Sequence, residues 1–327
     1  MKRGFYLGKY MPPHRGHLFV CETAMQLVDE LTVLVCALPD DPIAGPLRFA
    51  WMKEMLPRAR VLYHDAVVPQ TPAEHPDFWR IWTDICKTAH PEPIDEVFGS
   101  EPYIAKLATV LDARPNVIDP ERIAFPTSAT AIRSDPYGNW PMIPAPVQRH
   151  YQKRVVLMGA ESTGKTTLAQ ALAKTFATRC VPEYGRNYDA VQRHIGWQSD
   201  DFDRIATTHR ATSLATAPHA GPVLIEDTDP LQTRVWQKHL LDLTELTPNT
   251  AQTADLYLLL APDTPWINDG TRYQETTAKR MGFHTDCLSI LRQSGVGFCE
   301  ISGDWQSRQT AAKAAITDLL TFKGPQT

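Results

Sequence analysis

The first half of the chain alternates short apolar runs with amphipathic stretches. Apolar runs typical of buried strands lie at residues 5–7, 31–36, 60–63 and 96–98. Stretches with the spacing of apolar positions expected of helices lie at residues 16–29, 48–55 and 77–88. Strands that alternate with helices favour a parallel sheet covered by helices on both faces.

The pattern lapses over residues 136–153 and then starts again. This stretch holds four prolines, which fix φ and remove backbone donors, so we predict a linker at residues 141–153. Beyond it, apolar runs predict strands at residues 154–158, 222–226, 255–260 and 297–301, and helices are expected at residues 165–176, 201–217 and 305–320. The expected architecture is therefore two doubly wound α/β domains with parallel sheets, at residues 1–140 and 154–327.

Composition narrows the class of protein. The 327 residues suit two domains of about 150 residues each. The net charge of −4 gives no indication that the protein binds nucleic acid non-specifically. The six cysteines are scattered without a Cys-x-x-Cys pair, which fits reduced thiols in a cytoplasm. No signal peptide and no apolar stretch near the roughly 20 residues that cross a bilayer are evident, so we expect a cytoplasmic protein without a membrane partner.

A phosphate-binding loop follows the strand predicted at residues 154–158. Residues 159–166, GAESTGKT, match G-x-x-x-x-G-K-[ST] and open a predicted helix. Such loops turn backbone N–H groups toward ATP phosphates, while the lysine neutralises phosphate oxygens and the final hydroxyl holds Mg²⁺. A glycine turn that merely caps a helix is the alternative. The predicted ATP contacts are Gly159, Ser162, Thr163, Gly164, Lys165, Thr166 and Thr167, with Lys165 catalytic and Thr166 a metal ligand.

Acidic residues follow this loop at two later places. Glu183 begins the segment EYGR, and Asp227 and Asp229 follow the strand predicted at residues 222–226. An acid at the end of such a strand can hold Mg²⁺ or take the proton of an attacking hydroxyl, and ordinary turn acids are the alternative. We expect Glu183 and Asp227 to be catalytic, with Asp227 also on the metal. Which acid is the base stays open.

Further polar and aromatic residues complete the predicted kinase site. A lid is expected in the segment WINDGTR, where Arg272 would contact ATP, and Arg280 lies further on. Arginines in such lids neutralise charge on the transferring phosphoryl group. Trp266 could equally be a packing residue. The predicted substrate contacts are Tyr184, Arg186, Asp229 and Trp266.

A second phosphate motif lies near the N-terminus. Residues 8–17, GKYMPPHRGH, bring His14 and His17 to the start of the first predicted helix, with Gly16 allowing close backbone approach. Two imidazoles there can bind ATP phosphates and stabilise charge at the attacked phosphorus. A surface turn and half of a metal site are the alternatives. Residues 127–133, TSATAIR, add hydroxyls and an arginine suited to the outer phosphates.

Taken together, these motifs resemble a known family. GKYMPPHRGH and TSATAIR resemble the G-x-F-x-P-x-H-x-G-H and I-S-x-T-x-I-R motifs of the nucleotidyltransferase superfamily. With FGSEPY, RSDPYGNW, GAESTGKT, EYGR, DTD and WINDGTR in this order, the chain resembles the NadR family of bifunctional nicotinamide-nucleotide (NMN) adenylyltransferases and ribosylnicotinamide kinases. The resemblance implies a Rossmann-like nucleotidyltransferase domain followed by a P-loop kinase domain.

The resemblance also implies roles for residues of the first domain. His14 and His17 would be the catalytic pair, and the I-S position of the family motif is occupied by Thr127 and Ser128, a mild change. Trp79 and Trp82 would stack on nicotinamide, or else belong to the face of a helix that packs in the core. The implied ATP contacts are Gly8, Lys9, Gly16, Gly99, Ser100, Ser128, Thr130 and Arg133.

The implied function is the formation of NAD in two ATP- and Mg²⁺-dependent steps. Nicotinamide riboside would be phosphorylated to NMN, and NMN would be adenylylated to NAD and pyrophosphate. The alternatives are other acceptors for the same two folds, or a nucleotide-sensing regulator with weak turnover. Some family members carry a helix-turn-helix domain before the first strand, which this sequence does not show, so specific DNA binding is not expected. Whether the protein forms a homo-oligomer stays open.

Overall fold

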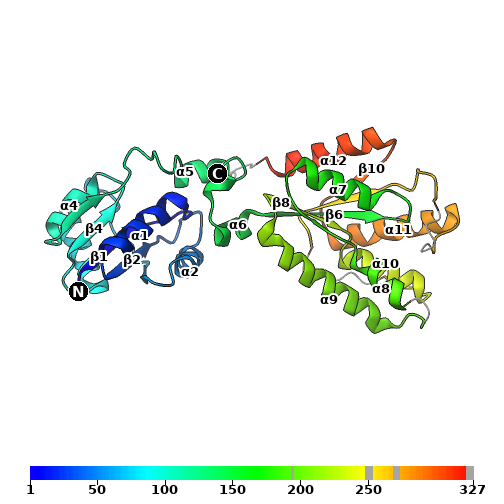
Figure 1. Ribbon diagram of the computed structural model, residues 1–327, viewed down its shortest axis with the longest axis horizontal. Helices are drawn as coiled ribbons and strands as arrows, with labels where there is room; N and C mark the ends of the chain where they lie inside the picture. Colours follow the sequence, from blue (N-terminus) through cyan, green and yellow to red (C-terminus); the bar gives the residue numbers. More distant parts are fainter. Residues whose placement is uncertain (193–194, 247–252, 268–272, 322–327) are drawn as a thin grey trace. The chain divides into compact units, whose positions relative to one another are not determined.

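The computed structural model describes residues 1–192, 195–246, 253–267 and 273–321, and divides the chain into two compact units (Figure 1). The first unit ends at His150 and the second begins at Tyr151. No helix within the described ranges is long and apolar enough to cross a membrane.

The first unit is built on a five-stranded parallel sheet in the order β3-β2-β1-β4-β5. Its strands are β1 (Arg3–Gly8), β2 (Glu30–Cys36), β3 (Arg60–His64), β4 (Glu96–Gly99) and β5 (Arg114–Val117). Its helices are α1 (Arg15–Leu27), α2 (Gly45–Met55), α3 (Phe78–Ala89), α4 (Tyr103–Val110) and α5 (Ala129–Ser134).

Alternate residues of this sheet face two different cores. Phe5 and Leu34 belong to one buried cluster, and their chain neighbours Tyr6 and Val33 belong to the other. Both faces are therefore covered, as a near-continuous apolar strand predicts. The order of the strands reverses between β1 and β4, and the crevice at the carboxyl ends of two such strands is where ligands bind in doubly wound sheets.

The second unit contains another five-stranded parallel sheet, in the order β10-β9-β6-β8-β7. Its strands are β6 (Lys153–Gly159), β7 (Cys180–Val181), β8 (Val223–Asp227), β9 (Leu256–Leu260) and β10 (Phe298–Ile301). Its helices are α7 (Lys165–Thr175), α8 (Tyr184–Gln192), α9 (Ser199–Thr216), α10 (Pro230–Leu240), α11 (Thr277–Ser294) and α12 (Trp305–Leu319), with a 3-10 turn η2 (Ala217–His219).

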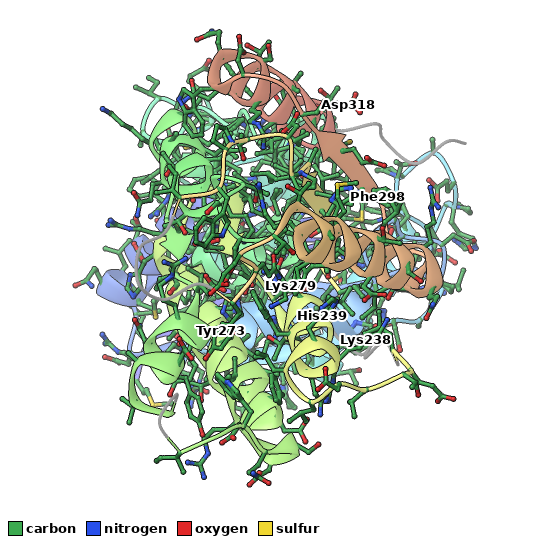
Figure 2. The ribbon with its side chains drawn as sticks, turned by 90° about the vertical axis from the view of Figure 1, so that its right-hand side faces the viewer. Lys238, His239, Tyr273, Lys279, Phe298 and Asp318 are labelled. Carbon is green, nitrogen blue, oxygen red and sulfur yellow. The ribbon has the colours of Figure 1, made fainter. Side chains whose placement is uncertain are left out.

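Helices cover both faces of this second sheet as well. Val155 of β6 packs in the cluster that includes α7 and α12, whereas Val156 packs in the cluster that includes α10 and α11. Lys238 and His239 of α10, labelled in Figure 2, both contact Asp286 of α11, at 2.6 and 2.8 Å. The two doubly wound α/β domains predicted from the sequence are thus confirmed.

The segment predicted as a linker contains regular structure. A 3-10 turn, η1 (Trp140–Met142), precedes helix α6 (Ala145–Tyr151). Ile143 and Val147 are fully buried, and Arg149 forms a bidentate pair with Glu54 of α2 at 2.7 Å to each oxygen. Prolines here occur at a turn and in the first turn of a helix, where their missing N–H group costs little.

Candidate active sites

The cavity of the first unit opens where β1 ends and α1 begins. His14 is the N-cap of α1, and its backbone N–H donates to Nδ1 of His17 at 3.2 Å. The two imidazole rings stack with centroids 3.7 Å apart. A Cβ at Gly16 would lie 3.0 Å from Nδ1 of His14, so glycine gives the histidine pair its room. Both imidazoles therefore stand at the positive end of a helix dipole.

Burial keeps both histidines neutral near pH 7. It lowers the pKa of His14 to about 4, and the positive charge of Arg122 adds to this effect. Burial also lowers the pKa of His17 well below its usual range, with further contributions from His14 and Arg122. Neutral imidazoles act on an anion as hydrogen-bond donors rather than as cations. Most positive charge in this cavity must come from elsewhere.

Arginine and lysine side chains of the cavity provide that charge. Arg122, which no sequence motif indicated, lines the cavity and pairs with Glu101 at 3.0 Å. Arg133 lines it too, and donates to the hydroxyl of Thr130 at 3.2 Å and to the carbonyl of Met11. The predicted residues that the structure brings into the cavity wall are Gly8, Lys9, His14, Gly16, His17, Ser100 and Arg133.

Lys9 is held at the cavity by an ion pair. Its Nζ lies 3.2 Å from Asp41, and the same carboxylate accepts a hydrogen bond of 2.6 Å from Arg48. Arg48 is fully buried and also donates to the backbone carbonyls of Ile43 and Cys36, at 2.8 and 3.1 Å. This arrangement fixes the loop before α2 beside the first phosphate motif.

Other residues predicted for this site have structural contacts instead. Ser128 caps α5, because its Oγ accepts the N–H group of Ala131 at 3.0 Å. Gly99 ends β4 where a Cβ would meet Ile104 at 2.5 Å. Trp82 is buried and donates from Nε1 to the carbonyl of Pro69 at 2.9 Å, and Trp79 packs against the same core. Neither tryptophan lines the cavity, which favours their packing role.

In the second unit the phosphate loop joins β6 to α7. Gly159 and Gly164 have φ of +143° and +86°, which side chains rarely adopt, so the glycines are required by the backbone. Lys165 is buried, and its Nζ donates to the carbonyls of Gly159 and Ala160 at 2.9 and 3.0 Å. Ser162 and Thr163 lie within the loop, and Thr167 is exposed on the first turn of α7.

Asp227 meets the loop at the carboxyl end of β8. Its Oδ2 accepts a hydrogen bond of 2.6 Å from Oγ1 of Thr166, whereas its buried Oδ1 is unpaired among the described residues. Burial, with the negative charge of Glu183, raises the pKa of Asp227 to about 6. Two protein oxygens side by side suit a cation such as Mg²⁺, which takes its other ligands from water and phosphates.

A pocket with an aromatic wall lies beside Lys165. Tyr273 donates from its hydroxyl to Asp189 at 2.6 Å, accepts from Nε1 of Trp197 at 3.3 Å and meets Trp236 edge to face at 6.4 Å between centroids. None of these aromatic residues is part of a recognised sequence motif, so the sequence analysis did not predict them as pocket residues. The pocket is lined by Glu161, Lys165, Glu183, Gly185, Arg186, Asp189, Trp197, Phe202, Ile205, His209, Thr228, Thr233, Trp236, Leu240 and Tyr273.

The remaining residues predicted for the kinase site divide into four groups. Glu183 and Arg186 line the pocket and pair with each other at 3.5 Å. Asp229 is buried, caps α10 and accepts the hydroxyl of Tyr257 at 2.6 Å, and these contacts favour a role in the fold. Tyr184 and the half-buried Trp266 are absent from the pocket lining within the described parts of the chain. Arg272 lies outside the described residues.

Glu161 ties the phosphate loop to the aromatic wall. Its carboxylate accepts the backbone N–H groups of Tyr273, at 3.0 Å, and of Gln274, at 2.8 Å. The side chain of Gln274 in turn accepts the N–H group of Glu161 at 3.1 Å. Arg280, which lies beyond the predicted lid segment, is buried and donates to the carbonyls of Glu161 and Thr264. These hydrogen bonds connect the phosphate loop directly to the segment that contains Tyr273.

Comparisons with known proteins agree with the division of the chain into two units. A family model described as cytidylyltransferase-like matches residues 5–135, and one described as an AAA domain matches residues 154–308. The trifunctional NAD biosynthesis/regulator protein NadR of Salmonella typhimurium is 26% identical over 361 residues, which cover 98% of this chain and 84% of that protein. The nicotinamide-nucleotide adenylyltransferase of Methanoculleus marisnigri is 30% identical over 145 residues, 43% of this chain and 83% of that protein.

Solved structures agree over the whole chain. The crystal structure of NadR protein in complex with NR has a TM-score of 0.75 at 22% identity, and that of NadR protein with NAD and AMP-PNP has a TM-score of 0.73 at 22% identity. Each comparison covers 100% of this chain and 98% of the other. Fold and sites define a two-domain enzyme, a nucleotidyltransferase-type domain followed by a P-loop kinase-type domain. The chain belongs to the NadR family.

Proposed function

We propose that the protein forms NAD from nicotinamide riboside in two steps. The second unit phosphorylates the riboside to NMN with ATP, and the first unit adenylylates NMN with a second ATP to give NAD and pyrophosphate. The observation that carries the proposal is that two phosphate-binding sites, a histidine pair and a P-loop beside an aromatic pocket, occur in one chain that matches NadR over its length.

In the first unit the phosphate of NMN is itself the nucleophile. It attacks the α-phosphorus of ATP, a bond to the pyrophosphate leaving group breaks, and no covalent enzyme intermediate is needed. His14 and His17 donate hydrogen bonds to the phosphate oxygens as negative charge builds up. Lys9, Arg122 and Arg133 neutralise the triphosphate, and Lys9 and Arg122 would exchange their present carboxylate partners for it.

In the second unit a hydroxyl of the riboside attacks the γ-phosphorus of ATP. We assign Glu183 as the base, because it lines the pocket whereas Asp227 does not and contacts Thr166 instead. Asp227 and Thr166 would hold Mg²⁺, which neutralises charge on the phosphates when bound. Lys165 would leave the loop carbonyls to bind the β- and γ-phosphates.

The aromatic wall would bind the nicotinamide ring. The ring of nicotinamide riboside is cationic, and cations are attracted to the faces of tryptophan and tyrosine. Trp236 and Tyr273 approach each other at the pocket and offer such faces. Glu161, Glu183 and Asp189 add negative charge to the same lining. We therefore propose that the pocket prefers a cationic nucleoside over a neutral one.

We also propose that each unit is one catalytic domain, with bounds near residues 1–140 and 154–327 and a connection at residues 141–153. Each cavity draws its lining from a single unit, which supports independent sites. A cytoplasmic location is proposed as well, because all six cysteines are free thiols and three of them are completely buried.

A steady-state assay tests the proposed function directly. The purified protein, given ATP, Mg²⁺ and NMN, should release NAD and pyrophosphate, and given nicotinamide riboside instead it should first accumulate NMN. Uridine and adenosine serve as competing acceptors for the kinase step. Turnover of these nucleosides in preference to the riboside, or binding of all ligands without turnover, would replace the proposal by another acceptor or by a sensor.

A further inference from the structure

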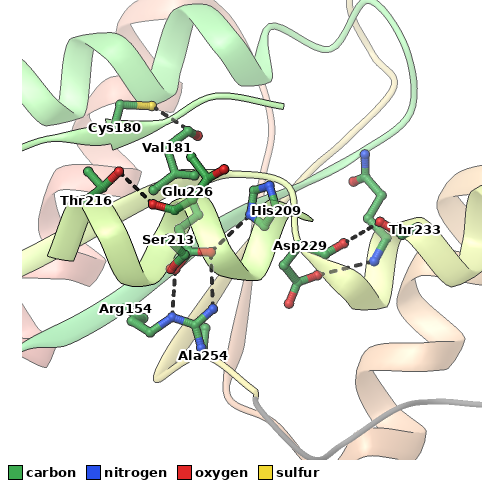
Figure 3. A network of polar contacts seen from close by, with 12 residues as sticks. Arg154, Cys180, Val181, His209, Ser213, Thr216, Glu226, Asp229, Thr233 and Ala254 are labelled. Carbon is green, nitrogen blue, oxygen red and sulfur yellow. Dashed lines mark hydrogen bonds and ion pairs between the residues drawn. The ribbon is translucent and has the colours of Figure 1, made fainter. Parts of the chain in front are cut away.

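Three polar side chains meet at the carboxylate of Glu226, the residue that precedes Asp227 on β8 (Figure 3). Arg154 donates from Nε to one oxygen at 2.6 Å and from Nη2 to the other at 3.1 Å. Ser213 donates to the first oxygen at 2.8 Å. His209 of α9 completes the set, with its Nε2 3.2 Å from the second oxygen. Glu226 itself is fully buried.

The charge on Glu226 decides which nitrogen of His209 carries a hydrogen. Arg154, whose guanidinium is always charged, donates to both oxygens of Glu226, and this ion pair holds the carboxyl in its ionised form. An ionised carboxylate only accepts hydrogen bonds, so Nε2 of His209 must be the donor. In the neutral imidazole, Nδ1 then carries the lone pair and is an acceptor.

The rest of the His209 ring faces the pocket beside Lys165. His209 lines that pocket, whereas its partner Glu226 does not. Phe202 and Ile205, which precede it on the same face of α9, line the pocket as well. Within the described ranges, Nδ1 of His209 has no hydrogen-bond partner. His209 therefore offers the pocket an oriented acceptor atom that no group of the described residues uses.

We propose that Nδ1 of His209 accepts a hydrogen bond from an N–H or O–H group of the bound acceptor nucleoside, and that Arg154 and Glu226 are positioning residues that orient its ring. The proposal rests on the proposed kinase function. Nicotinamide riboside offers such donors in its carboxamide and in its ribose hydroxyls. A site with a buried acceptor disfavours molecules that lack the matching donor, because the acceptor would then stay unpaired.

Two conservative substitutions separate this contact from a purely structural role. The amide of asparagine reaches about the place of Nδ1, and that of glutamine about the place of Nε2. His209→Gln should keep the contact with Glu226 and raise the KM for nicotinamide riboside about tenfold, with an unchanged KM for ATP. The KM of His209→Asn for nicotinamide riboside should lie closer to that of the wild type. The reverse order would show that His209 only supports Glu226, and would overturn the proposal.

Two further variants test whether Arg154 and Glu226 orient the ring of His209. Ser213→Ala removes another donor to Glu226 without touching the pocket, and should leave the KM for the riboside unchanged. The double variant Arg154→Met and Glu226→Met removes the ion pair together, a change that cores often tolerate. Here the KM should rise, and NMR of the imidazole nitrogens should show that the single Nε2–H tautomer is lost. A folded double variant with both readouts unchanged would contradict the positioning role.

A second substrate identifies the donor. Nicotinic acid riboside has a carboxylate in place of the carboxamide, and so lacks its N–H group. A KM increase for His209→Gln with nicotinamide riboside alone assigns the carboxamide, and an equal increase with both ribosides assigns a ribose hydroxyl. No increase with either overturns the inference. A wild-type protein that phosphorylates neither riboside would instead reject the proposed function, so the two failures are distinguishable.

Discussion

The two phosphate-binding sites of this protein begin alike and differ in their charges. In each, a loop after the first strand of a parallel sheet leads to the start of a helix, α1 or α7. In the first, burial lowers the pKa of both histidines, so the side chains at the helix start are uncharged near pH 7. In the second, a buried lysine lies near Asp227 and Glu183, and burial together with Glu183 raises the pKa of Asp227 to about 6.

This difference corresponds to the two nucleophiles. The phosphate of NMN is already an anion, so the first site needs donors and positive charge but no base. The hydroxyl of a riboside has to lose a proton, and the second site provides the carboxylate of Glu183 for that task, beside the proposed Mg²⁺ ligand Asp227. Similar folds with similar loops thus serve two reactions because the ionisable groups around the loop differ.

The largest expected effect is that of Lys165→Ala. It removes the charge that neutralises the transferring phosphoryl group, so kinase turnover should fall roughly 10³–10⁵-fold, as for comparable cationic groups. The first site contains no residue of this loop, so the conversion of NMN to NAD should stay at the wild-type rate. Measuring both half-reactions on one preparation checks this, with Lys174→Ala, also on α7, as a matched control.

Substitution of the two acids by their amides should separate their roles. Glu183→Gln removes the proposed base and should lower kinase kcat roughly 10²–10⁴-fold without changing the Mg²⁺ requirement. Asp227→Asn should instead raise the Mg²⁺ concentration needed for half-maximal rate. A Mg²⁺ titration of each variant distinguishes them, and wild-type turnover by both would remove the acids from the mechanism.

His17→Ala tests the other side of the comparison. It removes one donor at the triphosphate, and losses of this kind cost roughly 10²–10³ in rate. The effect should appear in NAD formation from NMN only. His219, in the 3-10 turn η2 of the other unit, provides a control, and His219→Ala should leave both rates unchanged.

The pH dependence of the two reactions should also differ. As pH falls below about 6, the carboxyl of Asp227 takes up a proton and becomes a poorer ligand for Mg²⁺, so kinase kcat/KM should fall about tenfold per pH unit. The histidines of the first site have lowered pKa values and stay neutral to lower pH, so the adenylyltransferase profile should be flat across this range. Parallel acid limbs in both profiles would contradict the assigned charges.

The smallest expected effect concerns Glu161. Glu161→Gln keeps the size of the side chain but turns one acceptor into a donor that faces the N–H groups of Tyr273 and Gln274. The KM values for ATP and for the riboside should both rise about fivefold, because a lost hydrogen bond to a charged group costs about 1 kcal/mol or more. Glu54→Gln, at an exposed ion pair with Arg149, is the matched control.

The sequence predicted those site residues that lie together in the chain. His14, His17 and Lys165 stand at strand–helix junctions, where local spacing alone carries the chemistry. Arg122 and Tyr273 reach the sites through the tertiary fold, and neither is part of a motif, although Tyr273 directly follows the segment WINDGTR.

Asp229 and Trp82 are predicted site residues for which the structure shows contacts that stabilise the fold. Asp229 precedes Pro230, and an aspartate before proline at the start of a helix is a typical N-cap, so its structural role could have been predicted. For Trp82, the amphipathic spacing of its helix is compatible with both core packing and stacking, and its burial, its contact with Pro69 and its absence from the cavity lining favour the core.

The central claim is that each unit contains a complete and independent site. Lys165→Ala and His17→Ala, each alone, should form little NAD from nicotinamide riboside and ATP, the first because no NMN forms and the second because NMN accumulates. Mixing the two variants should restore NAD formation through free NMN. The account is contradicted if either folded variant loses both half-reactions, or if the mixture forms no NAD although each variant retains its own half-reaction.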